Sequence, residues 1–150
     1  MGAAANARRV LPRLAGEFFS QVSAALASDP DAEQLHRVRL AAKQMRYTLE
    51  LFRPCYGPAL EERIESLREL QQILGEINDC AVTRRLVAAN RPSPHRLRAE
   101  RFLAARLRKK TAELRRRWAG DLGTDSQRRR WISYLAKNVR EPRQNRQRPA

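Results

Sequence analysis

The sequence has few of the residues on which metal sites and thiol chemistry depend. Its 150 residues include two cysteines, Cys55 and Cys80, and two histidines. The cysteines lack CxxC spacing, and two histidines cannot complete the ligand set of a structural zinc site. We therefore interpret both cysteines as small residues of the core or its boundary, and we expect neither a metal nor another cofactor.

Long hydrophobic runs are also missing, so no segment is predicted to span a bilayer. The first residues, MGAAANARRVLPRL, lack the apolar stretch of a signal peptide, and Asn6 stands where N-myristoylation needs Ser or Thr. We therefore expect a cytoplasmic protein. Hydrophobic residues make up 42% of the chain and aromatic residues only 6%, which favours one helical domain with a core of Leu, Ala, Ile and Val.

Acidic side chains are scarce in the last third of the chain. The formal net charge is +15, of which residues 1–31 carry 0, residues 32–92 carry +2 and residues 93–150 carry +13. Such a charge attracts polyanions of almost any kind, including nucleic acid, polyphosphate and acidic membranes. Arg outnumbers Lys by 27 to 4, which suits bidentate phosphate contacts but also accompanies a G+C-rich genome.

No stretch shows the alternation of a β-strand, and Pro and Gly separate segments with helical periodicity. The pattern predicts helices over residues 4–27, 32–52, 59 to at least 77, 95–119 and 125–139. The predicted fold class is all-α, an antiparallel bundle of about five to six helices that resembles a four-helix bundle. It covers residues 1–140, and residues 141–150 are predicted to be a disordered basic tail.

Three positions leave details of these helices open. Pro12 either frays the first turns of its helix or moves the helix start to near residue 11. Asn78-Asp79 either begins a further helix that ends near residue 89 or lies within one long bent helix. Gly75 lowers helix propensity, and we interpret it as a place where a neighbouring helix approaches closely.

The stretch LHRVRLAAKQMRYTLELF, residues 35–52, places four potentially cationic side chains on one helix face. These residues, called the basic stripe below, are His36, Arg39, Lys43 and Arg46. They share an arc of about 100° with Tyr47 and Glu50, opposite an apolar face. The spacing alone favours a solvated helix face, although four basic groups before the first acid are unusual for one. A second, cruder basic face lies on the helix predicted over residues 95–119 and contains Arg98, Arg101, Arg108 and Lys109.

Two stretches together resemble the CHAD family, the conserved-histidine α-helical domain. The family pattern is H-x-x-R-x-x-x-K/R-x-x-R-Y-x-x-E, followed about twenty residues later by L-Q-x-x-L-G-x-x-x-D. The first motif is matched by His36, Arg39, Lys43, Arg46, Tyr47 and Glu50. The second, in LQQILGEINDCAV, is matched by Leu70, Gln71, Leu74, Gly75 and Asp79. The resemblance covers roughly residues 10–135.

This resemblance implies a non-enzymatic domain that binds inorganic polyphosphate and associates with polyphosphate or storage granules. It implies phosphate contacts by Arg39, Lys43 and Arg46, with His36 at the end of the row. Supporting or orienting parts fall to Arg37, Tyr47, Glu50 and Asp79. Tyr47 either donates a hydrogen bond or packs, and the two acids either orient a basic side chain or form ordinary ion pairs.

The family usually has two such units in tandem, whereas this chain shows one copy that resembles the C-terminal half. Either two chains pair to rebuild the cavity, or the sequence is a fragment, or it is a degenerate member with an open groove; we favour a homodimer. The competing hypotheses are a sequence-nonspecific nucleic-acid-binding protein and a granule scaffold. Nucleic acid is in either case an expected nonspecific competitor. Enzymatic activity has the least support, because no nucleophile–base pair, carboxylate pair or metal set is visible.

Overall fold

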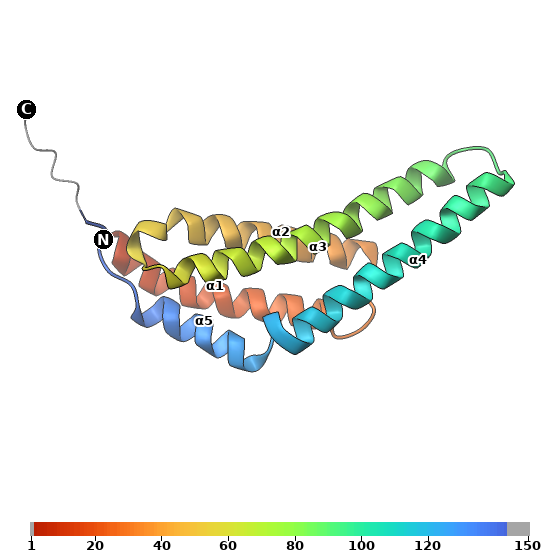
Figure 1. Ribbon diagram of the computed structural model, residues 1–150. Helices are drawn as coiled ribbons and strands as arrows, with labels where there is room; N and C mark the ends of the chain where they lie inside the picture. The colour runs from red at the N-terminus through yellow and green to blue at the C-terminus, as the bar shows by residue number, and fades with distance from the viewer. Residues whose placement is uncertain (1, 144–150) are drawn as a thin grey trace, which may run out of the picture.

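The computed structural model describes residues 2–143 and is all-α, which confirms the predicted fold class (Figure 1). Its α-helices are α1 (Ala3–Leu26), α2 (Ala32–Leu51), α3 (Ala59–Ala88), α4 (Pro94–Arg117) and α5 (Asp125–Lys137). A short 3₁₀ turn, η1 (Arg53–Cys55), follows α2, and a π-helical turn, η2 (Trp118–Leu122), follows α4. The described part of the chain contains no β-strand. Most of the predicted disordered tail, residues 144–150, lies outside the described residues.

Local capping explains why the helix starts were predictable. Asp31 and Gln34 form a reciprocal capping box at the start of α2. The Ser93 hydroxyl accepts a hydrogen bond from the backbone N–H of Arg96 at the start of α4, and Thr124 caps α5 in the same way. Each cap satisfies a backbone donor that has no partner within the helix, so the chain can begin a helix there.

Two of the open details are now decided by tertiary packing. α3 continues without a break through Asn78-Asp79, so the single long helix is the correct alternative. α1 begins at Ala3 and contains Pro12, so the helix start is not displaced to residue 11. Buried residues on both sides of Pro12, Ala7 and Ala15, hold this helix against the core despite the missing N–H.

The core of the bundle is apolar and is closed by aromatic side chains from three elements. The ring centroids of Phe19 and Trp131 lie 5.2 Å apart, and Phe19 also contacts Trp118. The Tyr56 hydroxyl donates a 2.6 Å hydrogen bond to the carbonyl oxygen of Leu135, which ties η1 to α5. Both cysteines are buried, as predicted for core or boundary residues.

α3 and α4 continue beyond the bundle as a projecting two-helix arm (Figure 1). No residue from 81 to 110 is buried, whereas α3 before residue 81 and α4 after residue 110 contribute to the core. We call residues 81–110 the arm. The remaining described residues form the bundle, and the boundary between the two regions lies beside the basic stripe.

Candidate anion-binding site

The two motif helices, α2 and α3, pack side by side, and this packing brings the motifs together. Arg46 of the first motif lies in one shallow groove of about 480 Å³ with Gln71, Gly75 and Asp79 of the second. The remaining lining residues are Arg68, Gln72 and Glu76. Residues that are some thirty positions apart in sequence therefore share a surface, which the spacing within either motif could not establish.

Gly75 does not serve the role that its sequence suggested. A Cβ atom added at this position would meet nothing within 4 Å, so no neighbouring helix approaches closely there. The prediction of a close helix approach is wrong. The missing side chain instead leaves the groove between α2 and α3 open to solvent at its centre.

Arg46 is held in place on both sides of its guanidinium group. Its side chain is 21% exposed, its Nη1 lies 3.9 Å from the Glu50 carboxylate, and its Cζ lies 4.9 Å from the centroid of the Tyr47 ring. Glu50 also lies 3.6 Å from Arg68 of α3. The carboxylate thus positions two guanidinium groups at one end of the groove. Arg46 Nε is buried and has no hydrogen-bond partner within residues 2–143.

Asp79 lines the same groove, and its carboxylate forms no ion pair with another described residue. Its neighbour in the groove, Glu76, lies 2.7 Å from Lys110 of α4. The hydrogen bond from Lys110 lowers the pKa of Glu76, and the same contact raises the pKa of Lys110. The groove therefore contains two basic and two acidic side chains and has little surplus charge.

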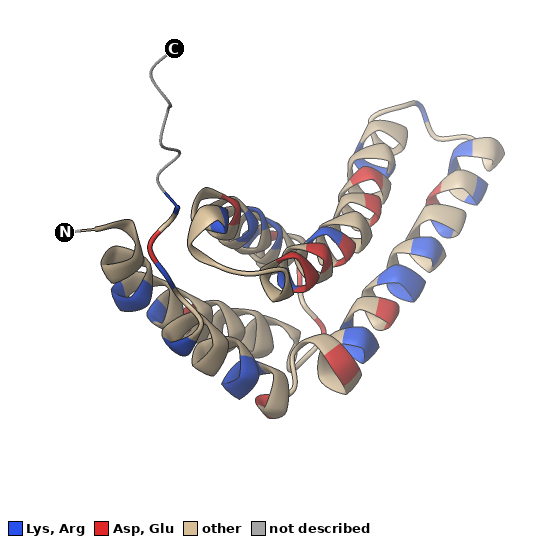
Figure 2. Ribbon diagram, turned by 60° about the vertical axis from the view of Figure 1, so that its left-hand side comes forward, with Lys and Arg blue, Asp and Glu red and all other residues tan. Residues whose placement is uncertain are grey.

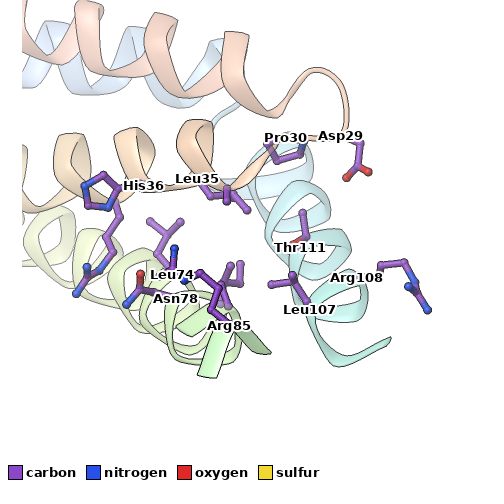
Figure 3. Close-up of a pocket in the computed structure, with 14 residues that line it drawn as sticks. Asp29, Pro30, Leu35, His36, Leu74, Asn78, Arg85, Leu107, Arg108 and Thr111 are labelled. Atoms are coloured by element: carbon purple, nitrogen blue, oxygen red, sulfur yellow. The ribbon is translucent and has the colours of Figure 1, made fainter. Parts of the chain in front are cut away.

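His36 and Arg39 lie in a different place, at the base of the arm. They line a cavity of about 440 Å³ between α2, α3 and α4 (Figure 3). Arg85 of α3 and Arg108 of α4 also line it, and Asp29 is the single acidic residue in the lining. This cavity has surplus positive charge, unlike the groove beside Arg46.

Sequence reasoning missed Arg85. Its helix is nearly neutral overall, and no motif includes it. Asn78 and Arg85 both line the cavity, and they are seven residues apart in sequence. Helical periodicity therefore places them on one face of α3. That face became relevant only once α3 was shown to be continuous past Asp79.

Lys43 points to a third surface, on the outer side of α2. Its Nζ lies 5.7 Å from the centroid of the Tyr47 ring, which is half exposed. Two exposed apolar residues, Leu40 and Leu51, lie on the same shallow surface. The basic stripe is therefore continuous along α2 but borders three distinct surroundings.

The other predicted residues lie apart from this region. Arg37 is exposed and forms a 2.6 Å ion pair with Glu33 on its own helix. The second basic face is on the exposed side of α4, and Figure 2 shows Lys and Arg on successive turns of that helix. Of its four residues only Arg108 reaches the cavity, and Arg98 lies 2.9 Å from the ring of His95 on the arm.

The family model of the CHAD domain matches residues 2–88. The chain belongs to the CHAD family. The match ends at the last residue of α3, covers both motifs, and is consistent with a single half of a CHAD domain. Neither a curated protein nor a solved structure matches the chain.

CHAD domains are linked with polyphosphate-related proteins. Within residues 2–143 no group of three or more His, Cys, Asp or Glu side chains is placed to hold a metal ion. No helix in the same range is long and apolar enough to cross a membrane.

Proposed function

We propose that this CHAD protein binds inorganic polyphosphate along the basic stripe and does not itself catalyse a reaction. The observation that carries the proposal is that His36, Arg39 and Lys43 have no carboxylate partner among the described residues. Arg37, one residue from the stripe, is paired with Glu33. The charges of Arg39 and Lys43 are therefore available to an anionic ligand.

The geometry of a helix supports an extended polyanion as the ligand. The stripe spans residues 36–46, which corresponds to about 15 Å along the axis of α2. Arg39 and Arg46 supply forked donors that match phosphate oxygens, and Lys43 supplies a point charge between them. Binding of this kind releases counterions, so we expect it to weaken steeply as the salt concentration rises.

The test is a binding measurement with a matched charge control. In one variant Arg39, Lys43 and Arg46 are replaced by Ala, and in the control Arg98, Arg101 and Lys109 are replaced by Ala. Both variants lose three positive charges from exposed or half-buried positions. At about 150 mM salt the stripe variant is expected to bind long-chain polyphosphate about 100-fold more weakly or worse, and the control to change by less than threefold.

If both variants lose polyphosphate affinity equally, the stripe contributes no more than general surface charge, and the proposal is contradicted. Duplex DNA at matched charge tests the nucleic-acid alternative, because a sequence-nonspecific DNA-binding protein would release polyphosphate as DNA is added. We expect DNA to compete only weakly. A fluorescent fusion that follows polyphosphate granules only when the stripe is intact would extend the proposal to granule targeting.

We further propose that two chains pair to complete the binding surface. The support is the exposed apolar surface beside Lys43, where Leu40, Tyr47 and Leu51 are 50%, 50% and 74% exposed. Burying these side chains against a second copy would bring two stripes together. Light scattering is expected to give the mass of a dimer, and replacing Leu40 and Leu51 by Gln is expected to return a monomer. A monomer in the unsubstituted protein would rule this out.

A further inference from the structure

The cavity at the base of the arm has apolar walls, which the binding of polyphosphate does not require. Its lining includes four buried residues, Leu35, Leu74, Ile77 and Thr111, and the half-buried Leu107 (Figure 3). A volume of about 440 Å³ falls in the range of small-molecule sites, about 300–1,000 Å³. Inorganic phosphate has no apolar surface to place against such walls, and burying its charges there would be costly.

The rim of the same cavity is basic and comes from separate helices. Arg39 projects from α2 and Arg85 from α3, and neither side chain forms an ion pair or hydrogen bond with a described residue. In Figure 3 the His36 ring and Arg85 lie on the α2–α3 side of the apolar lining, and the end of Arg108 points outward past α4. The cationic groups available to a bound head group are therefore gathered on one side.

We infer that this cavity binds an anionic amphiphile, a small molecule with one acidic head group and an unbranched apolar body. The carboxylate or phosphate head lies between Arg39 and Arg85, and the apolar body lies against Leu35, Leu74 and Leu107. Arginine donates paired hydrogen bonds to either kind of head group. The inference goes beyond polyphosphate binding, because its specificity comes from the apolar lining and from Arg85, neither of which belongs to the basic stripe.

Decanoate is the probe, and its binding is measured by titration calorimetry below the concentration at which it forms micelles. We expect one decanoate per chain, with affinity falling two- to fourfold for each methylene removed towards hexanoate, since every methylene contributes to burial. Decanol, which lacks the charge, and butanoate, which lacks the chain, are expected to bind at least tenfold more weakly. Decyl phosphate distinguishes a phosphate head from a carboxylate head.

Two variants and their controls assign the binding to the cavity. Arg85→Gln is expected to weaken decanoate binding about fivefold or more, whereas Arg84→Gln, which removes a neighbouring exposed charge outside the cavity, leaves it unchanged. Ala81→Phe fills the cavity from α3 and is expected to abolish decanoate binding. Ala105→Phe places the same side chain on the exposed side of α4 as its control.

Affinity that does not depend on chain length, several decanoates bound per chain, or equal losses in Arg84→Gln and Arg85→Gln would overturn the inference. A second pattern would also overturn it: the unsubstituted protein binds no decanoate, and Ala81→Phe changes the oligomeric state. That result would mean that a second copy of the chain occupies the cavity. If Ala81→Phe misfolds, the comparison of Arg85→Gln with Arg84→Gln still tests whether decanoate binds in the cavity. Failure here is distinct from failure of the proposed function, since Ala81→Phe leaves polyphosphate binding intact and Lys43→Ala with Arg46→Ala leaves decanoate binding intact.

Discussion

The bundle and the arm share two helices, α3 and α4, yet these helices are held differently in the two regions. In the bundle, α3 and α4 pack against other helices and bury residues such as Leu70 and Leu114. In the arm neither helix has a buried residue, and the 3.4 Å approach of Cys80 Sγ to the Leu103 carbonyl oxygen lies at the inner end of its α3 segment, just before Ala81. A helix with one packed side gains less from burial, so capping and helix propensity matter more there.

The cavity inferred above to bind an anionic amphiphile lies where the two regions meet. Its lining combines buried residues of the bundle, such as Ile77, with Arg85 of the arm. We therefore expect local opening of the arm to move Arg85 and so change the rim of the cavity without unfolding the bundle. Four predictions test how separate the two regions are.

The largest effect is expected from truncating one leucine in each region of α4. Leu114→Ala removes a fully buried side chain from the bundle and is expected to lower the free energy of unfolding by about 2–5 kcal/mol. Leu97→Ala removes a side chain that is 53% exposed on the arm and is expected to cost no more than about 0.5 kcal/mol. Urea denaturation monitored by circular dichroism measures both. Equal losses would mean that the arm is packed as the bundle is.

The second effect depends on pH and belongs to the bundle. Burial raises the pKa of Tyr56 from 10.0 to about 12, with smaller contributions from Cys55 and Tyr134. Because the folded protein holds the neutral phenol more strongly than the unfolded chain does, this contribution to stability is complete below pH 10 and is lost as the pH rises towards 12. Tyr56→Phe is expected to reduce the fall in stability over that range. It also removes the hydrogen bond to Leu135, which costs about 1 kcal/mol at neutral pH.

A pH profile of unfolding that is the same for Tyr56→Phe and the unsubstituted protein would contradict this assignment. Tyr134 is still present in this variant, and burial raises its pKa as well, so part of the fall in stability is expected to remain.

A third prediction compares two helix caps. Ser93→Ala removes the cap of α4 at the tip of the arm, and Thr124→Ala removes the cap of α5 in the bundle. Each loss costs about 1 kcal/mol. In Ser93→Ala we expect amide hydrogen exchange to become about fivefold faster in the first turns of α4 only, because the arm opens locally. In Thr124→Ala we expect the cost to appear in the global free energy of unfolding instead.

The smallest effect is a gain in stability at the groove. Gly75→Ala is expected to raise the free energy of unfolding by about 0.5–1 kcal/mol, because helix propensity improves and the added methyl group meets no neighbour. Gly123→Ala is the contrasting variant and is expected to destabilise the protein, since an added Cβ would overlap the Trp118 ring. Thermal unfolding of both variants measures the difference. A loss of stability in Gly75→Ala would show that a neighbour closes over this position.

Much of the fold followed from local signals. Asp31 predicts a cap because its carboxylate reaches the backbone of the next turn, and this holds whatever surrounds the helix. Trp131, Leu135 and Val139 fall on one face by helical spacing, and all three are buried. The course of the chain at Asn78-Asp79 was not decided locally, because both residues cap helices well and are also tolerated inside them.

The site was less predictable than the fold. The positions of His36, Arg39, Lys43 and Arg46 on one face of α2 were correct, but that face is wide enough to border both α3 and solvent. The sequence could not divide the stripe among a cavity, a groove and an outer surface. It also could not place Arg85 in one cavity with His36 and Arg39, because that arrangement depends on how α3 and α4 pack beside α2.

The sequence by itself determined the helices, their caps, the basic stripe and the two family motifs, because each depends on residues within a few turns of one another. Only the tertiary structure decided that Gly75 opens a groove, that Glu50 holds Arg46 beside Arg68, and that an apolar cavity with a basic rim forms at the base of the arm. Those features join side chains from two or three helices. Their positions follow from packing, which no spacing within a single helix records.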